Sequence, residues 1–136
     1  MRKRLLNNRG QGYVDVVISV LIIAFLLILS VSIWSMVTLK QDVRYFCNEL
    51  LEMASSTGQI GSAVEARYFE LCEESGITPT VEFSASYYDV SAKKVQYGTI
   101  IQCTVTCQMT LPGFSGFRFP INVSATQSGL SRHYWK

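Results

Sequence analysis

The chain has 136 residues, with 12 Lys and Arg against 10 Asp and Glu, and its formal net charge is +2. This length fits one small domain with an appendage. Four of the basic residues lie within the first ten positions, so residues 38–136 hold eight basic against nine acidic side chains, a net charge of −1. A nucleic-acid-binding protein usually carries a clustered basic face, and this charge distribution argues against that class.

A long apolar run follows the basic tip. Val16–Val37 contains 22 residues without a charge. As a helix it would be roughly 33 Å long at about 1.5 Å per residue, against a hydrocarbon thickness of about 30 Å. Flanks rich in Lys and Arg stay on the cytoplasmic side of a membrane. The sequence therefore predicts a basic leader at 1–10, a transmembrane helix at 11–37 and an extracytoplasmic domain at 38–136 in a single-pass protein of the cell membrane.

The helical pattern continues beyond the membrane run. Apolar residues recur at steps of four and three, the spacing of an amphipathic helix: Leu39, Val43, Phe46, Leu50 and Met53. No proline interrupts residues 1–78. One helix is therefore predicted from about Tyr13 to Thr57, with Gly58 and Gly61 at its end.

A second helix and a sheet follow. Ser62 with Glu65 three positions later has the pattern of a capping box, which predicts a helix to about Ser75, before Gly76. Apolar and polar residues then alternate, as in half-buried strands, and strands are predicted at Val81–Tyr87, Ile101–Leu111 and Ile121–Ala125. The predicted fold is α+β: a long helix, a short helix, and a three-stranded antiparallel sheet whose apolar face a helix covers.

Gly10, Gln11 and Asp15 stand at the junction between the basic tip and the apolar run. A membrane helix has no ordinary use for a carboxylate there, because a charge inside hydrocarbon costs free energy. A short basic leader, a glycine at the cleavage point and an acid at the fifth position of the mature chain resemble the class III signal sequence of type IV pilins and pseudopilins.

Over about its first 35 residues, the chain looks most like TadE-like pseudopilins of tight-adherence pili. Its outline is similar to a TadE-related family of Gram-positive bacteria that is often associated with mobile elements. Asp15 stands where the family has glutamate, Gln11 stands where major pilins have phenylalanine, and the membrane run lacks a helix-kinking proline. These departures favour a minor, pseudopilin-like component with a pilin-like fold.

The resemblance implies a structural subunit of a cell-surface pilus, secretion or conjugation apparatus. A prepilin peptidase in the membrane would cut between Gly10 and Gln11, and glycine suits a scissile position because it has no side chain. The new α-ammonium of Gln11 would pair with Asp15 of a neighbouring subunit, which offsets the cost of burying both charges. The implied partners are the membrane, the peptidase and other pilin-like subunits, without nucleic acid, small-molecule substrate, cofactor or metal.

Other interpretations of the N-terminal region stay open. Asp15 also fits a boundary charge at the level of the cytoplasmic headgroups. The chain also fits an uncleaved single-pass anchor whose external domain binds another protein. A secreted binding domain cut after Ser32 is a third possibility, because Ser30 and Ser32 have the spacing of a signal peptidase site. No nucleophile motif, phosphate loop or carboxylate pair is recognisable, so the chain is predicted not to be an enzyme.

Four cysteines, Cys47, Cys72, Cys103 and Cys107, are predicted to lie outside the membrane, where disulfides form. Cys103 and Cys107 share a strand, and four residues of strand span about 13 Å. That separation exceeds the limit of about 7 Å for a disulfide. Cys47 can reach Cys72, and either of these can reach a strand cysteine. Buried thiols that pack as small apolar residues are an equally good interpretation, and no zinc-type spacing is present.

Overall fold

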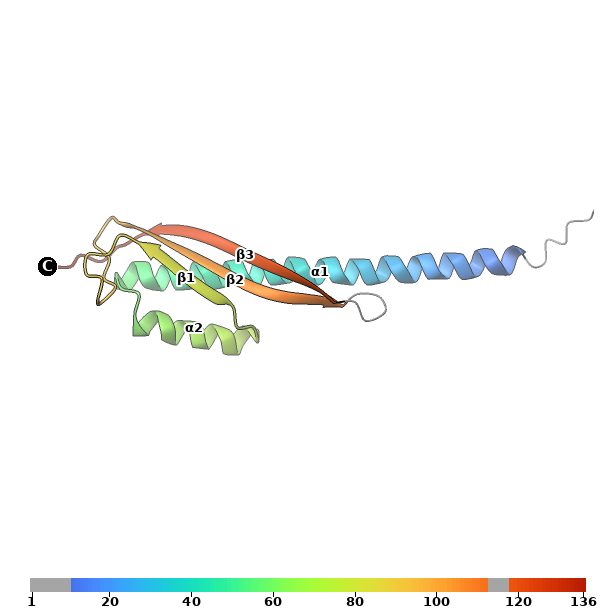
Figure 1. The fold of residues 1–136 in the computed structure, drawn as a ribbon, viewed down its shortest axis with the longest axis horizontal. Helices are drawn as coiled ribbons and strands as arrows, with labels where there is room; N and C mark the ends of the chain where they lie inside the picture. The colour runs from blue at the N-terminus through green and yellow to red at the C-terminus, as the bar shows by residue number, and fades with distance from the viewer. Residues whose placement is uncertain (1–10, 113–117) are drawn as a thin grey trace, which may run out of the picture. The chain divides into compact units, whose positions relative to one another are not determined.

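The computed structural model describes residues 11–112 and 118–136. Its elements in chain order are α1 (Gln11–Thr57), α2 (Ser62–Ser75), β1 (Thr80–Ala85), β2 (Ile100–Pro112) and β3 (Arg118–Leu130), as Figure 1 shows. The strands form one antiparallel sheet in the order β1-β2-β3. The predicted α+β fold is confirmed. The chain divides into two compact units, Met1–Met36 and Val37–Lys136, and each is described by itself.

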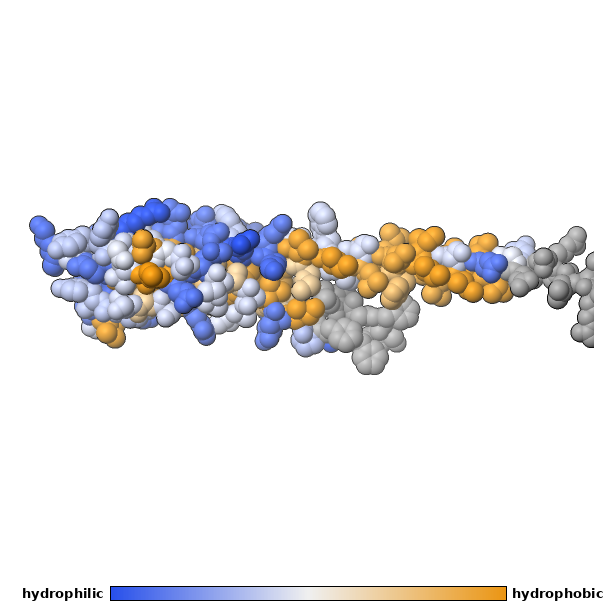
Figure 2. Space-filling model, turned by 90° about the horizontal axis from the view of Figure 1, so that it is seen from above, coloured by the Kyte–Doolittle hydropathy of each residue, from blue (hydrophilic) through white to orange (hydrophobic). Residues whose placement is uncertain are grey.

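The described part of the first unit is the apolar portion of α1. Among the residues that the structure describes, α1 is the one helix long and apolar enough to cross a membrane. Every position from Gly12 to Val31 is exposed, because nothing in the described part of the chain covers it. Figure 2 shows this portion as a mostly orange, hydrophobic surface. This part of α1 is therefore a candidate membrane anchor.

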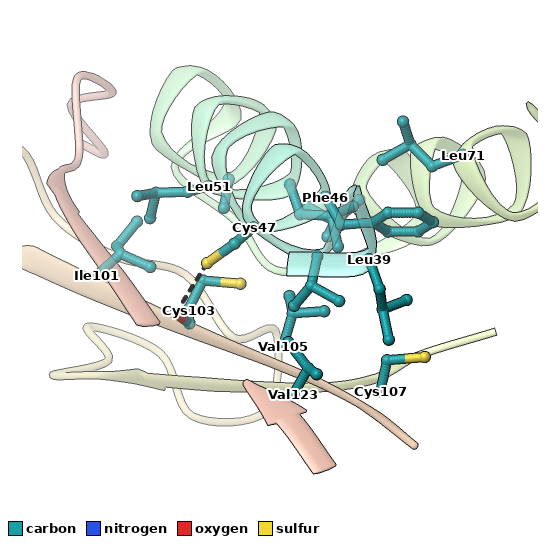
Figure 3. Close-up of a cluster of buried hydrophobic side chains, with 14 of the residues drawn as sticks. Leu39, Phe46, Cys47, Leu51, Leu71, Ile101, Cys103, Val105, Cys107 and Val123 are labelled. Atoms are coloured by element: carbon teal, nitrogen blue, oxygen red, sulfur yellow. Dashed lines mark hydrogen bonds between the residues drawn. The ribbon is translucent and has the colours of Figure 1, made fainter. Parts of the chain in front are cut away.

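The core of the second unit lies between the helices and the sheet. The α1 side chains buried in it recur at the predicted steps: Leu39, Val43, Phe46, Cys47, Leu50, Leu51 and Ala54. Strand β2 contributes every second residue, from Ile101 through Cys103 and Val105 to Cys107, as Figure 3 shows. From α2, Val64 and Leu71 are buried, and the ring of Tyr68 meets Phe46 edge-on at 6.4 Å between centroids. One continuous apolar cluster therefore joins α1, α2 and the sheet.

The outer face of the sheet is polar. Outward residues of neighbouring strands stand opposite each other, as Glu82 does with Thr104, and Thr104 with Thr126. The hydroxyls of Thr104 and Thr126 are 3.0 Å apart and share a hydrogen bond. The alternation of apolar and polar residues along β2 thus divides the strand between core and solvent.

Strand β3 extends beyond its predicted end at Ala125. The added segment carries Gly129 at an inward position, where the alternation calls for an apolar side chain. A Cβ at Gly129 would meet the hydroxyl of Ser55 at 3.3 Å and Cδ2 of Leu51 at 3.4 Å. A glycine suits this inward position because α1 leaves little room for a side chain.

Two predicted local features are corrected. Strand β1 ends at Ala85 and not at Tyr87, because the chain turns back there and the Tyr88 N–H donates to the Lys94 carbonyl at 2.8 Å. The capping box does not form, since Gly61 is the N-cap of α2 and no side chain caps the helix. Ser62 is instead the first residue inside the helix.

The C-terminal residues pack onto the folded unit, which the sequence did not predict. The buried Ser131 donates its hydroxyl to the Val95 carbonyl at 3.1 Å. The indole N–H of Trp135 donates to the Gly58 carbonyl at 3.1 Å, and Lys94 Nζ lies 4.2 Å from the centroid of the Trp135 ring. These contacts tie the tail to the end of α1 and to the turn before β2.

Gly58 is the position where this packing depends on a missing side chain. It terminates α1 with a φ of 63°, and a Cβ there would meet the Cβ of His133 at 2.5 Å. Gly76 terminates α2 with a φ of 70°, and a Cβ there would meet no heavy atom within 4 Å. Both glycines therefore have a positive φ that disfavours a side chain, but only at Gly58 would an added side chain also clash with His133.

We expect Gly58→Ala to destabilise the folded unit by about 2–4 kcal/mol, combining left-handed backbone strain of about 1 kcal/mol with a steric clash. Gly76→Ala should cost only about 1 kcal/mol, because strain alone applies. Urea unfolding of the full chain in detergent, in a Trp34→Phe background so that the fluorescence reports Trp135, measures both. Equal losses in the two variants would contradict the packing of the tail against Gly58.

Candidate functional site

Asp15 is the one acidic residue of the described apolar portion of α1. It lies one turn into the helix and is exposed. Its backbone carbonyl accepts a hydrogen bond from the Ser19 hydroxyl at 2.7 Å. Among the described residues, its carboxylate has no hydrogen-bond or ion-pair partner. The charged group therefore projects from an exposed helix surface formed by apolar neighbours such as Val14 and Val16.

The serine hydroxyls of the same helix portion form hydrogen bonds within the helix. Ser30, Ser32 and Ser35 donate to the carbonyls of Leu26, Ile28 and Val31 at 2.8, 2.9 and 3.0 Å. A polar group inside hydrocarbon is tolerated when its hydrogen bonds are made within the helix. The carboxylate of Asp15 is thus the one formally charged group in the described apolar portion of α1, and it has no partner among the described residues.

The candidate cleavage site falls at the start of the described chain. Gly10 lies outside the described residues, and Gln11 is the first residue of α1. At Gly12 an added Cβ would find no heavy atom within 4 Å, so this second glycine has no packing role in the described chain. Asp15 follows Gln11 by one helical turn, and both lie at the N-terminal end of α1.

Ser32, the position for the other cut considered, lies inside α1. The helix continues for 25 residues after it, from Ile33 to Thr57, and the Ser32 hydroxyl is engaged with the Ile28 carbonyl. A signal peptidase would have to bind this segment in a non-helical state, either before α1 forms or in a chain in which α1 does not form there.

All four cysteines are free thiols. Cys47 of α1 and Cys103 of β2 are fully buried and meet in the core, where the Cys47 thiol donates to the Cys103 carbonyl at 3.1 Å, as Figure 3 shows. Burial raises the pKa of the Cys103 thiol, and the adjacent Cys47 raises that pKa further. Cys72 is half-buried beside Tyr68, and Cys107 lies further along β2. The structure thus brings together one helix cysteine and one strand cysteine, in contact as protonated thiols.

An ion-pair network joins the two helices. Arg67 of α2 lies 2.9 Å from Glu49 of α1 and 2.9 Å from Glu70, and its third neighbour, Glu74, is at 4.0 Å. These carboxylates raise the pKa of Arg67. Through Glu49 the network links α2 to α1. In the described ranges, no group of three or more His, Cys, Asp or Glu side chains is arranged to hold a metal ion.

The comparisons with known proteins return one family. The family model described as Domain of unknown function (DUF4320) matches residues 20–136. No curated protein matches the chain, and no solved structure matches it. The match covers the apolar part of α1 from residue 20 and the whole folded unit, and it leaves Gly10, Gln11 and Asp15 outside.

Proposed function

The chain belongs to the DUF4320 family, and we propose that it is a pseudopilin-like structural subunit of a cell-surface pilus, secretion or conjugation apparatus. In this proposal a prepilin peptidase cuts after Gly10. Helix α1 then stays in the membrane, or enters a filament, with its basic end on the cytoplasmic side, and residues 38–136 lie outside.

The observation that carries the proposal is that the Asp15 carboxylate has no partner among the described residues, on an apolar helix portion whose serine hydroxyls bond within the helix. A charge in that environment is costly unless it is paired. Cleavage after Gly10 would create a positive α-ammonium four residues before Asp15. A single intramembrane cut would therefore supply, on the neighbouring subunit of a helical bundle, a partner that the carboxylate lacks among the described residues.

The test is the mass of the mature chain, purified from membranes of cells that express a prepilin peptidase. We expect an N-terminus at Gln11. Gly10→Val should block the cut and leave an N-terminus at Met1, whereas Gly12→Ala should be cut normally because Gly12 lies beyond the scissile bond.

Two other masses would overturn the proposal. A wild-type chain that begins at Met1 in these cells would indicate the uncleaved anchor with an external binding domain. A chain that begins at Ile33 would indicate a secreted domain released by cleavage after Ser32.

A further inference from the structure

Two surfaces of the folded unit carry opposite charge and lie at opposite edges of the sheet. We infer that the exposed face of α2 in one copy docks into the groove between α1 and β3 of a second copy. We call these surfaces the acidic face and the basic groove. The inference rests on the proposed function, because it describes how copies held side by side by their membrane helices would meet outside.

The acidic face is the exposed side of α2. Helix α2 contains four glutamates and one arginine, a formal charge of −3. Arg67 is turned toward Glu49, Glu70 and Glu74, whereas Glu65 and Glu73 have no ion-pair partner in the described part of the chain. Phe69 lies between Glu65 and Glu73, one turn from each, and its side chain is 65% exposed. The face therefore presents an apolar ring flanked by two free carboxylates.

The basic groove lies between α1 and the free edge of β3. It encloses about 380 Å³ and is lined by Val37, Lys40, Gln41 and Arg44 of α1 and by Ser124, Ala125, Thr126 and Gln127 of β3. None of the eight lining residues is acidic. Neither Lys40 nor Arg44 forms an ion pair within the described ranges. The groove thus has two free cations beside the aliphatic side chains of Val37 and Ala125.

The two surfaces are placed so that both can be used at once. Helix α2 lines a groove with β1, the first strand of the sheet, and the basic groove borders β3, the last strand. Figure 1 shows α2 beside β1 and away from β3. The end of α2 lies beside Asp42 and Tyr45 of α1, close in the α1 sequence to Lys40 and Arg44. The middle of α2 is paired with α1 through Glu49, so the acidic face lies about 10 Å further along α1 than the basic groove. Opposite edges therefore permit lateral contact between copies that are staggered along their helices.

The apolar and charged groups of the two surfaces complement each other. Phe69 would enter beside Val37 and Ala125, where the flanking cations also favour the face of an aromatic ring. Glu65 and Glu73 are separated by about 12 Å along α2, and Lys40 and Arg44 by about 6 Å along α1. The long, flexible stems of Lys and Arg span the difference.

Such a contact is heterologous, because it joins different surfaces of the two copies. Each copy that receives an acidic face still offers its own acidic face to the next. A heterologous contact of this kind closes into a ring or continues as a helical array, depending on its rotation. The pairing therefore suits a subunit that adds repeatedly to one growing end.

The test uses the full-length chain in membranes, with a photoreactive phenylalanine analogue at Gln41 in the basic groove. Expression of isotope-labelled and unlabelled chains together distinguishes contacts between copies from contacts within one copy. We expect the analogue to capture residues 62–75 of another copy. The same analogue at Ser84, on the outer face of the sheet, is the control and should not capture that segment.

Charge reversal then tests the pairing itself. K40E/R44E and E65K/E73K should each lower capture about tenfold, and the combination of all four substitutions should restore at least half of it. E82K/K136E reverses one charge of each sign outside both surfaces and should leave capture unchanged. Because exposed charges are screened by salt, raising the salt concentration to about 1 M should also lower wild-type capture.

Several results would overturn the inference: capture of a different segment, no capture, equal capture in the single reversals and the wild type, or no recovery in the combined variant. Amide exchange of β2 in each variant establishes that the unit is folded, so that loss of folding is not read as loss of contact. If cleavage after Gly10 occurs while capture fails, this inference alone is wrong. If capture succeeds in a chain that retains Met1, the contact stands and the proposed processing does not.

Discussion

Replacing Asp15 by alanine should lower the recovery of assembled subunits about a hundredfold while leaving membrane insertion intact. Truncating one partner of a buried ion pair leaves the other charge uncompensated, which costs about 3–5 kcal/mol. Each 1.4 kcal/mol corresponds to about a factor of ten in an equilibrium constant, so even the lower end of that cost exceeds a hundredfold. Recovery is measured as the fraction of the chain in sheared surface material or in crosslinked oligomers, relative to total membrane-bound chain.

Two further substitutions at Asp15 separate charge from shape. Asp15→Asn keeps the size of the side chain and removes the charge, so it should fail as alanine does. Asp15→Glu keeps the charge and extends its reach by one methylene, so it should retain assembly. Ser19→Ala is the control one turn further along, because it removes only an internal hydrogen bond to the Asp15 carbonyl. Normal recovery of the Asp15→Asn variant would contradict the ion pair and support a boundary charge at the headgroups.

The sequence predicted the fold well where one physical pattern dominated. The buried positions of α1 repeat every three or four residues, and the inward residues of β2 alternate without interruption from Ile101 to Cys107. Gly58 and Gly76 both adopt a positive φ at a helix end, as a glycine after a helical pattern predicts. These features depend on neighbours in the sequence, which is why the sequence reveals them.

The sequence did not predict features that depend on contacts between residues far apart in the chain. Gly129 takes an inward position of β3 where Leu51 and Ser55 of α1 leave little room for a side chain. Trp135 and Ser131 pack because Gly58 and Val95 supply carbonyl acceptors far away in the sequence. A tryptophan in a short polar tail was the available signal, since so large an apolar surface is seldom left in water.

The candidate sites divide in the same way. Asp15 was identified from its charge at the start of an apolar run and from its spacing to Gly10, and the structure adds that its carboxylate lacks a partner in the described chain. The contact between Cys47 and Cys103 was one of several pairings that the sequence left open, because only the packing of α1 on β2 selects among them. The basic groove could not be predicted, since Lys40 and Arg44 become a surface only when β3 lies beside them.

Phe46→Ala should destabilise the folded unit by about 3–5 kcal/mol, the usual cost of removing a buried aromatic side chain and leaving a cavity. Phe46 is fully buried where α1 meets α2 and contacts the ring of Tyr68. A domain of this size is commonly stable by only about 5–15 kcal/mol. The loss should therefore lower the urea midpoint of the unit steeply and make α2 the first element to detach from α1.

Phe69→Ala is the matched control, because it removes the same side chain from a position that also contacts Tyr68, with the ring centroids 5.6 Å apart. Phe69 is 65% exposed, so little apolar surface returns to water when it is truncated, and the cost should stay within about 1 kcal/mol. The chain has two tryptophans, and a Trp34→Phe background leaves Trp135 as the reporter of the folded unit during urea unfolding. Similarly small losses for Phe46→Ala and Phe69→Ala would mean that the packing of Phe46 against α2 contributes little to the stability of the folded unit. A large loss for Phe46→Ala alone would mean that α2 is held chiefly by its buried side, which leaves its exposed side available for contacts with other subunits.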